Sequence, residues 1–173
     1  LPTNGPRDVP SEMTYAYHYQ DALFLMIDGT SSLDAQVDWI ESQLKNTKAK
    51  WKFAMFHFPP YNFEEDYWEI RQKCCSIFDR YPVDMVMVGH THDYLRTKPM
   101  YNEKPVASPA EGTIYTMSIS IEGKQEHWPD EDYAVVRYKG GPLYQYIQIK
   151  DGKLDYKCLD PDGNIKDAFV IEK

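Results

Sequence analysis

Short apolar runs alternate with one-sided helical patterns between Leu23 and Val88, and this order limits the chain to few folds. Two segments carry apolar residues at the spacing of one helix face, and the runs around them are short enough for buried strands. We predict strands over 23–27, 52–58 and 83–88, and helices over 33–45 and 64–81, the first with Ser32 as its N-cap. This order favours right-handed crossovers, and hence a largely parallel or mixed sheet covered by two helices.

The rest of the chain has the texture of antiparallel β structure. Tyr15–Tyr19 is joined to the first apolar run by Gln20-Asp21, which predicts a hairpin. After Tyr101, short aromatic and β-branched segments alternate with turn residues. We predict strands over 113–121, 133–138, 143–150, 153–159 and 165–172. Both regions are expected to share one core, so that residues 1–173 belong to a single domain.

Composition excludes several classes of function. The formal net charge is −8, whereas a surface that neutralises nucleic-acid phosphates needs clustered Lys and Arg. The apolar runs are too short to span a bilayer. Cys74, Cys75 and Cys158 do not form a disulfide framework, and we expect them to be buried packing thiols.

Three histidines stand where predicted strands end. His57 precedes Pro59-Pro60, and His90 and His92 follow Gly89, whose flexibility would let the loop turn both rings toward one centre. Ligands of α/β sheets collect at the carboxyl ends of the strands, and neutral imidazoles bind borderline divalent metals. A lone histidine is more often a hydrogen-bonded core or surface residue. From the residues alone, a metal site and a structural role both remain open.

Two sequence blocks carry a family resemblance. They are Trp51-Lys-Phe-Ala-Met-Phe-His-Phe-Pro-Pro-Tyr61 and Tyr81-Pro-Val-Asp-Met-Val-Met-Val-Gly-His-Thr-His-Asp-Tyr-Leu-Arg-Thr97. They resemble the last two motif blocks of calcineurin-like metallophosphoesterases, and most closely the purple acid phosphatase branch. The segment from Leu23 through the helix containing Gln36-Val37-Asp38-Trp39-Ile40 is similar to the stretch that precedes these blocks. The resemblance implies an α/β fold: half of a four-layer α/β/β/α sandwich, with two helices covering a mixed sheet and a C-terminal antiparallel β region.

The resemblance also implies a site with two divalent or trivalent metal ions, Zn, Fe or Mn. His57 and His90 would bind one metal, and His92 would bind the other. Tyr94 and Arg96 match positions at the rim of the site and, with Tyr61, are candidates for substrate binding. The Asp-x-His, Gly-Asp-x-x-Tyr and Gly-Asn-His-Glu blocks of the family do not occur in this sequence. No catalytic residue is therefore assigned within the chain, and the missing ligands are expected from a partner, the N-terminal half of the same protein.

The implied activity is hydrolysis of phosphomonoesters, as in acid phosphatases, by water activated at the dinuclear site. Alternatives are a phosphodiesterase or nucleotidase with the same ligands, and a non-catalytic chain that acts as a binding or structural partner. The expected ligand is a phosphorylated small molecule, not nucleic acid or membrane, and the family resemblance points to a secreted or periplasmic protein. The isolated chain is expected to be inactive and to self-associate, because half a sandwich leaves a sheet face and edges uncovered.

Other residues are weaker candidates. His18 is expected on a strand face, and His127 lies beside Trp128 in a loop where it would line the mouth of the site or have no role. The acidic run 130–132 lacks the spacing of a calcium loop and is expected to be solvated. Phe63, Trp68 and Trp128 are candidates for gating a pocket, whereas Tyr67 is expected in the core.

Overall fold

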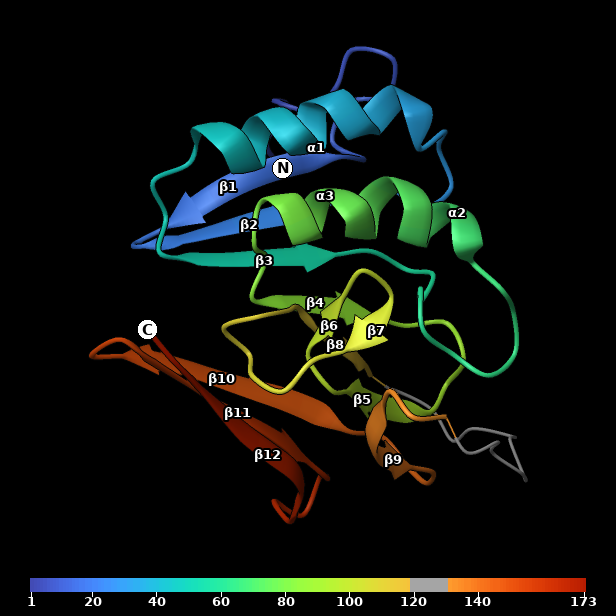
Figure 1. The fold of residues 1–173 in the computed structure, drawn as a ribbon, viewed down its shortest axis with the longest axis vertical. Helices are drawn as coiled ribbons and strands as arrows, with labels where there is room; N and C mark the ends of the chain where they lie inside the picture. Colours follow the sequence, from blue (N-terminus) through green and yellow to red (C-terminus); the bar gives the residue numbers. More distant parts are fainter. Residues whose placement is uncertain (119–130) are drawn as a thin grey trace.

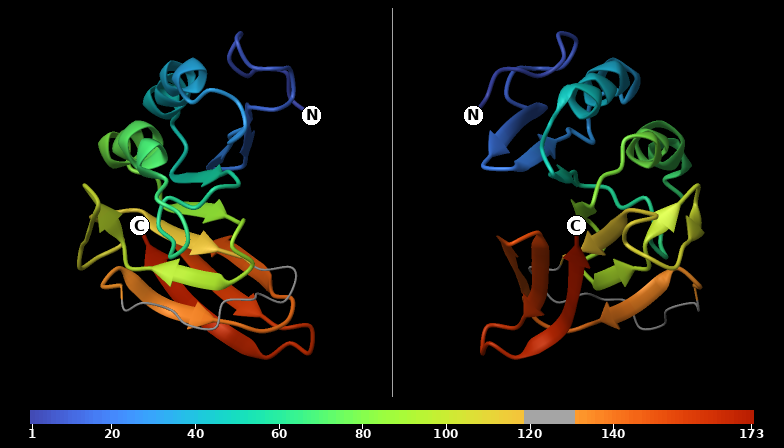
Figure 2. Two further views of the ribbon diagram at one scale, coloured as in Figure 1. Left: turned by 90° about the vertical axis from the view of Figure 1, so that its right-hand side faces the viewer. Right: turned by 60° about the vertical axis from the view of Figure 1, so that its left-hand side comes forward.

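The computed structural model describes residues 1–118 and 131–173, and within them the chain forms three layers. Helices cover one face of a seven-stranded sheet, and a three-stranded sheet covers part of the other face (Figures 1 and 2). The elements are β1 (Tyr15–Tyr19), β2 (Ala22–Met26), α1 (Asp34–Asn46), β3 (Trp51–Met55), α2 (Trp68–Ile70), η1 (Arg71–Cys75), α3 (Ser76–Arg80), β4 (Met85–Val88), β5 (Tyr94–Thr97), β6 (Met100–Tyr101), β7 (Lys104–Pro105), β8 (Ile114–Met117), β9 (Ala134–Tyr138), β10 (Tyr144–Lys150), β11 (Lys153–Leu159) and β12 (Ile165–Glu172).

The large sheet is mixed, as predicted. Its strand order is β1-β2-β3-β4-β8-β5-β9, and β2, β3, β4 and β8 are parallel to one another. The strands β1, β5 and β9 are antiparallel to their neighbours. The four parallel strands therefore end at one edge of the sheet, which is where α/β folds place their ligands.

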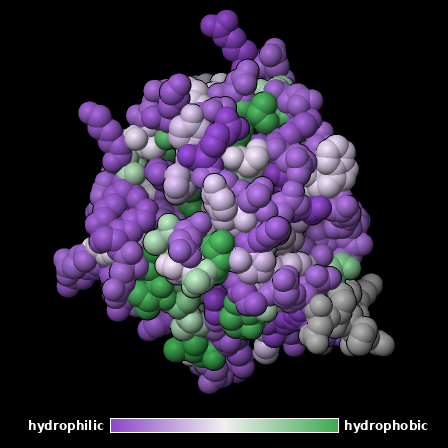
Figure 3. Space-filling model, in the orientation of Figure 1, coloured by the Kyte–Doolittle hydropathy of each residue, from purple (hydrophilic) through white to green (hydrophobic). Residues whose placement is uncertain are grey.

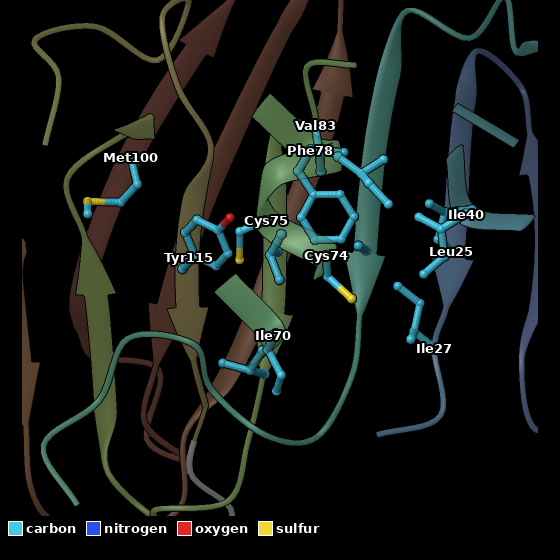
Figure 4. Packing of buried hydrophobic residues seen from close by; sticks show 14 of the residues in the cluster. Leu25, Ile27, Ile40, Ile70, Cys74, Cys75, Phe78, Val83, Met100 and Tyr115 are labelled. Carbon is cyan, nitrogen blue, oxygen red and sulfur yellow. The ribbon is translucent and has the colours of Figure 1, made fainter. Parts of the chain in front are cut away.

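Alternating side chains of the central strands build two hydrophobic cores. In β4, Val86 and Val88 belong to the core under the helices, whereas Met85 and Met87 belong to the core under the small sheet. The helix-side core contains Phe78 and the two neighbouring cysteines, Cys74 and Cys75 (Figure 4). All three cysteines are buried and free, which confirms the expectation of packing thiols. Burial on both faces explains why the central strands are continuous apolar runs.

The two predicted helices are present with shifted ends. The second is a continuous segment, α2-η1-α3, whose middle is a π-helical turn. It begins at Trp68 rather than Glu64, because the Asn62 side chain accepts hydrogen bonds from the backbone N–H groups of Glu64 and Glu65 and holds a turn there. Within the described residues, no helix is long and apolar enough to cross a membrane.

The prediction of Ser32 as the N-cap of α1 is wrong. The cap position is Leu33, which makes no side-chain capping bond. The buried Gln36 instead donates its amide to the backbone carbonyls of Asp28 and Ser32. This side chain connects the start of α1 to the segment that follows β2. A residue of the first helical turn, and not an N-cap side chain, therefore holds the start of the helix in place.

Contrary to the prediction, the region after Tyr101 is not wholly antiparallel. Of the strands predicted there, β8 lies parallel to β4 inside the large sheet, and β9 joins the same sheet antiparallel to β5. The sequence analysis missed β5, because its four residues follow the histidine block directly. The predicted hairpin between 15–19 and 23–27 is confirmed as β1 and β2, and the predictions for β10, β11 and β12 are confirmed as well. Residues 119–121 of one predicted strand lie outside the described part of the chain.

A buried ion pair joins the two sheets. The Arg96 guanidinium of β5 donates to both carboxylate oxygens of Asp167 in β12, at 2.6 and 3.0 Å. The Tyr94 hydroxyl donates to the same carboxylate at 2.7 Å. The side chains of Arg96 and Asp167 are only 12% and 3% exposed. A buried charge pair of this kind fixes position, and removing one partner leaves an uncompensated charge.

We therefore expect Asp167→Asn to lower the free energy of unfolding by about 3–5 kcal/mol, because the Arg96 charge stays buried without its carboxylate. Urea denaturation measures the effect. The matched control is the double substitution Arg96→Met with Asp167→Leu, which removes both charges and should recover most of the loss. A decrease below about 1 kcal/mol for Asp167→Asn would show that the pair is effectively solvated.

Candidate metal centre

The backbone ladder extends past the ends of the parallel strands. The Phe56 N–H donates to the Met87 carbonyl at 3.2 Å, and the Gly89 N–H donates to the His57 carbonyl at 3.0 Å. The Ser118 N–H donates to the Val88 carbonyl at 3.1 Å on the other side of β4. His57 and His90 therefore follow two neighbouring strands that stay paired up to the histidines themselves.

The rings of His57 and His90 meet at this edge of the sheet. Nε2 of His57 and Nδ1 of His90 lie 3.2 Å apart, and the rings are nearly perpendicular, with an interplanar angle of 80°. Two imidazoles bound to one zinc ion at about 2.0–2.1 Å place their nitrogens about 2.8–3.0 Å apart at an octahedral angle and about 3.3–3.4 Å apart at a tetrahedral angle. The observed separation is that of a hydrogen bond between the two rings, and it lies between the two values expected for ligands of one metal ion.

The loop that carries the second block is conformationally unusual. His90 and His92 both have positive φ angles, of 84° and 59°. Non-glycine residues seldom adopt this region, and such outliers cluster at functional sites. The turn expected at Gly89 is thus made by the histidines themselves, since the φ of Gly89 is not positive. A Cβ at Gly89 would lie 3.7 Å from Nδ1 of His57, an ordinary contact.

His92 does not complete a metal-binding cluster within the described residues. No group of three His, Cys, Asp or Glu side chains there is arranged to hold a metal ion. His92 is exposed, whereas the residue before it, Thr91, is buried. The structure thus brings together two of the three predicted ligands, and these two residues suit part of one metal's coordination shell.

Aromatic side chains line the histidine pair. The Phe58 ring lies 5.0 Å from the rings of both His57 and His90, and the Tyr67 ring lies 6.0 Å from that of His90. The Tyr67 hydroxyl donates to Glu65, and burial together with this hydrogen bond raises the pKa of the phenol, so it remains protonated. Tyr67 packs against the helix-side core, as expected, and its half-buried ring also lies beside the site. Sequence reasoning did not single out Phe58.

Asp28 lies at the end of β2, on the same edge of the sheet. Its carboxylate accepts hydrogen bonds from the Thr30 N–H, the Thr30 hydroxyl and the Ser31 hydroxyl. Burial alone would raise the pKa of Asp28, but the hydrogen bonds from Ser31 and Thr30 outweigh it and lower the pKa. The following Gly29 packs on Phe58, where an added Cβ would stand 3.0 Å from the ring. Asp28 therefore organises the loop that supports the aromatic lining.

Asp93 is the second carboxylate that the sequence analysis missed. It is 2% exposed, and its Oδ1 has no hydrogen-bond partner among residues 1–118 and 131–173. Burial, and then the charge of Glu64, raise the pKa of its carboxyl group. In the sequence, its position directly after His92 was the one indication that it lies near the site.

The three candidates for substrate binding all have partners inside the chain. Tyr94 is fully buried and Arg96 is paired with Asp167, as described above. Tyr61 is buried in the helix-side core, with its ring 4.9 Å from that of Tyr115. These contacts assign the three residues to the packing of the fold.

Some of the weaker candidates lie among the described residues, and the others lie outside them. His18 lies on β1, and its Nε2 is 3.0 Å from the Thr47 hydroxyl, as expected for a strand-face residue. Phe63 stacks with Tyr133, whereas Trp68 is exposed at the start of α2. His127, Trp128 and Asp130 lie outside the described residues.

The chain is similar to known proteins in sequence and in fold. Residues 9–94 match the family model described as calcineurin-like phosphoesterase. The chain belongs to this family. It is similar to purple acid phosphatase 21 of Arabidopsis thaliana, with 27% identity over 126 residues that make up 67% of this chain and 28% of that protein. The probable purple acid phosphatase 20 of the same plant is 26% identical over 106 residues, 54% of this chain and 25% of its own length.

Solved structures show the same fold. Purple acid phosphatase PPD1 from yellow lupin (Lupinus luteus) seeds matches with a TM-score of 0.73 and 17% identity, over 95% of this chain and 34% of that one. GAP50, described as the anchor in the inner membrane complex of Plasmodium, matches with a TM-score of 0.70 and 10% identity, over 92% of this chain and 53% of that one. The chain spans about a quarter of the curated relatives' length. Membership of this family implies divalent metal ions in general terms.

We expect Asp28→Asn to lower the free energy of unfolding at pH 7 by about 1–2 kcal/mol, because the amide nitrogen cannot accept the hydroxyl protons. The folded-state pKa of Asp28 is depressed, so its contribution is present above the ordinary value of 3.8 and is lost as the pH falls through the folded value. Urea titrations of both proteins from pH 7 to pH 3 measure this. The difference between them should shrink below about pH 4, and a pH-independent difference would contradict the assignment.

Proposed function

We propose that this chain supplies the histidine side of a dinuclear metal centre in a metal-dependent phosphoric-ester hydrolase. The observation that carries the proposal is the 3.2 Å separation of the His57 and His90 ring nitrogens at the carboxyl edge of the sheet. Membership of the calcineurin-like phosphoesterase family gives the chemical class.

The proposed roles follow from the residues. His57 and His90 would bind one metal ion, and His92 the second, with Zn, Fe or Mn as the candidate metals. Such a pair of ions polarises phosphoryl oxygens, lowers the pKa of a bound water and orients in-line attack on phosphorus. The aromatic rings of Phe58 and Tyr67 would limit the rotation of the His90 ring and exclude water from one side of it.

The remaining ligands must carry negative charge. Neutral imidazoles alone do not offset two neighbouring dications, whereas carboxylates between them would. We propose that these ligands come from the N-terminal half of the same protein. The matched structures are two to three times longer than the part that this chain covers, which leaves room for such a half. The chain by itself should bind one metal ion weakly and turn over no substrate.

The proposed substrate is a phosphomonoester, by similarity to purple acid phosphatases. The loop next to the site is acidic, with Glu64, Glu65 and Asp66 exposed. The basic neighbour Arg71 is already bound to Asp66 and Glu103. Since this surface repels a doubly charged monoester more than a singly charged diester, a phosphodiesterase is the alternative. The ratio of activities on p-nitrophenyl phosphate and its bis ester in the longer polypeptide decides between them.

A non-catalytic role is the second candidate. The observation that favours it is that no group of three ligands forms in the described residues. GAP50 shares the fold and is described as an anchor, so the fold alone does not imply hydrolysis. In this case the histidine pair would be a remnant, and the chain would not bind metal ions.

We expect the 173-residue chain to bind one zinc ion per chain, measured by isothermal titration calorimetry at pH 7.5. His57→Ala and His90→Ala should each lower the affinity by about tenfold or more, because each removes one of only two ligands. His92→Ala should change it less than threefold, since His92 is assigned to the second metal. His18→Ala is the matched control, because His18 lies on β1, away from the strand ends that carry the site.

Two results would contradict the proposal. Absence of zinc binding by the wild-type chain up to millimolar zinc would favour the non-catalytic role. Equal losses for His18→Ala and His57→Ala would show that zinc binds to scattered surface histidines instead.

A further inference from the structure

A pocket of about 420 Å³ lies beside the histidine pair, where α1 and α2 begin (Figure 1). Its lining consists of residues 29–33, which lead into α1, and residues 66–70, at the start of α2, together with Phe58. Neither His57 nor His90 lines it. The pocket is therefore a separate space next to the candidate metal centre.

Two aromatic rings form the wall between the pocket and the histidine pair. The Phe58 ring lies 5.0 Å from the rings of both His57 and His90. The Tyr67 ring lies 5.3 Å from that of Phe58 and 6.0 Å from that of His90. A group in the pocket is thus one ring away from the candidate metal ligands. If the phosphoryl group of an ester binds at the metal ions, its alcohol part reaches this pocket.

The pocket belongs to the helix side of the large sheet. Ile70 is part of the helix-side core, and Leu33 and Phe58 pack against that core. In the four-layer sandwich that the family resemblance implies, the N-terminal half packs on the opposite face of this sheet. The walls on the helix side are therefore supplied by this chain itself.

Three hydroxyl groups of the lining have already given their protons to carboxylates of this chain. Thr30 and Ser31 donate to Asp28, and Tyr67 donates to Glu65. Asp28 can only accept, because its pKa lies below the ordinary value of 3.8 and the group is ionised at neutral pH. The hydroxyl oxygens keep free lone pairs. Toward a ligand, these three groups therefore act as hydrogen-bond acceptors.

The charged groups of the lining are acceptors as well. Asp66 and Glu69 contribute carboxylates, and none of the described residues that line the pocket is Lys, Arg or His. Each carboxylate is paired with a cation outside the lining, Asp66 with Arg71 and Glu69 with Lys73. The pairing offsets their charge, so that a cationic ligand gains little. A phosphate group finds no positive side chain in the pocket, whereas neutral hydroxyl groups find several acceptors.

The pocket also has an aromatic face. Trp68 lies at the start of α2 and is 60% exposed, and its indole N–H is a hydrogen-bond donor. In the space-filling view, the surface around the helices is mainly hydrophilic, whereas apolar side chains gather in the region of the small sheet (Figure 3). An aromatic ring among polar groups suits a ligand with apolar C–H faces and a polar rim.

We propose that this pocket binds the alcohol part of the substrate, and that this alcohol is an uncharged polyol such as a sugar. The inference rests on the proposed function, because it places the phosphoryl group at the metal ions. The polyol would donate hydroxyl protons to Thr30 and Ser31 and lay its C–H face on Trp68. A simple alkyl phosphate would leave these acceptors without donors, which disfavours it relative to the polyol ester.

Binding of glucose to the metal-free 173-residue chain tests the pocket separately from catalysis. Two-dimensional proton–nitrogen NMR detects weak binding and resolves the Trp68 indole N–H and the backbone amides of Thr30 and Ser31. We expect these signals to shift with glucose and to saturate in the millimolar range. Cyclohexanemethanol, a ring of similar size with one hydroxyl group, should bind about tenfold more weakly, because it donates fewer hydrogen bonds. Inorganic phosphate should not shift them.

Two variants test the assigned contacts. Trp68→Ala should weaken glucose binding by about threefold to tenfold, since it removes the aromatic face. Glu69→Lys should weaken glucose binding and allow phosphate to bind, because it replaces an acceptor by a cation. The matched control is Tyr19→Ala, which removes an aromatic side chain that is 66% exposed at the opposite end of the sheet, where β1 pairs with the start of β2. It should leave glucose binding unchanged, and thermal unfolding checks that each variant folds.

Three results would overturn the proposal. The first is that glucose at several hundred millimolar leaves the signals of Thr30, Ser31 and Trp68 in place. The second is equal affinity for glucose and cyclohexanemethanol, and the third is an equal loss for Trp68→Ala and Tyr19→Ala. The probe carries no phosphate and the chain no metal, so the zinc titration remains an independent test. Zinc binding without glucose binding would leave the proposed function standing and overturn only the polyol inference.

Discussion

The parallel pairing of β3 with β4 is the constraint on which the rest of the structure depends. It continues beyond the strands to the hydrogen bond from the Gly89 N–H to the His57 carbonyl. These backbone hydrogen bonds fix the main chain at both histidines, and the contact between the rings places their nitrogens 3.2 Å apart. A centre built on paired strands avoids much of the ordering cost that a site on flexible loops would carry.

The same sheet decides which candidate residues can reach a ligand. Successive side chains of β5 point to opposite faces, and Tyr94 and Arg96 therefore share the face that packs on the small sheet. There they meet Asp167 and hold the two sheets together. Their position just after the histidine block made them look like rim residues in the sequence. The strand geometry assigns them to the interior instead.

The sequence was informative where one signal dominated and uninformative where several elements had to meet. Periodicity predicted the helices, and apolar runs predicted β2, β3 and β4, because burial on both faces leaves a strong pattern. The pairing partners of β8 and β9 could not be predicted, since sheet order depends on contacts between distant segments such as Val86 with Tyr115. The prediction of the α1 N-cap failed for a related reason, because the Gln36 side chain donates to the carbonyl of Asp28, eight residues earlier in the chain. His57 and His90 could be paired by their motif blocks, whereas Phe58, Asp28 and Asp93 needed the three-dimensional arrangement.

The central claim is that His57 and His90 are ligands of one metal ion. The most direct measurement is a crystal structure of the zinc-loaded chain, with anomalous scattering recorded on both sides of the zinc absorption edge. A zinc peak within about 2.0–2.1 Å of Nε2 of His57 and Nδ1 of His90 is the predicted result. Zinc bound elsewhere in the loaded crystal, or no zinc peak between these two nitrogens, would contradict the claim.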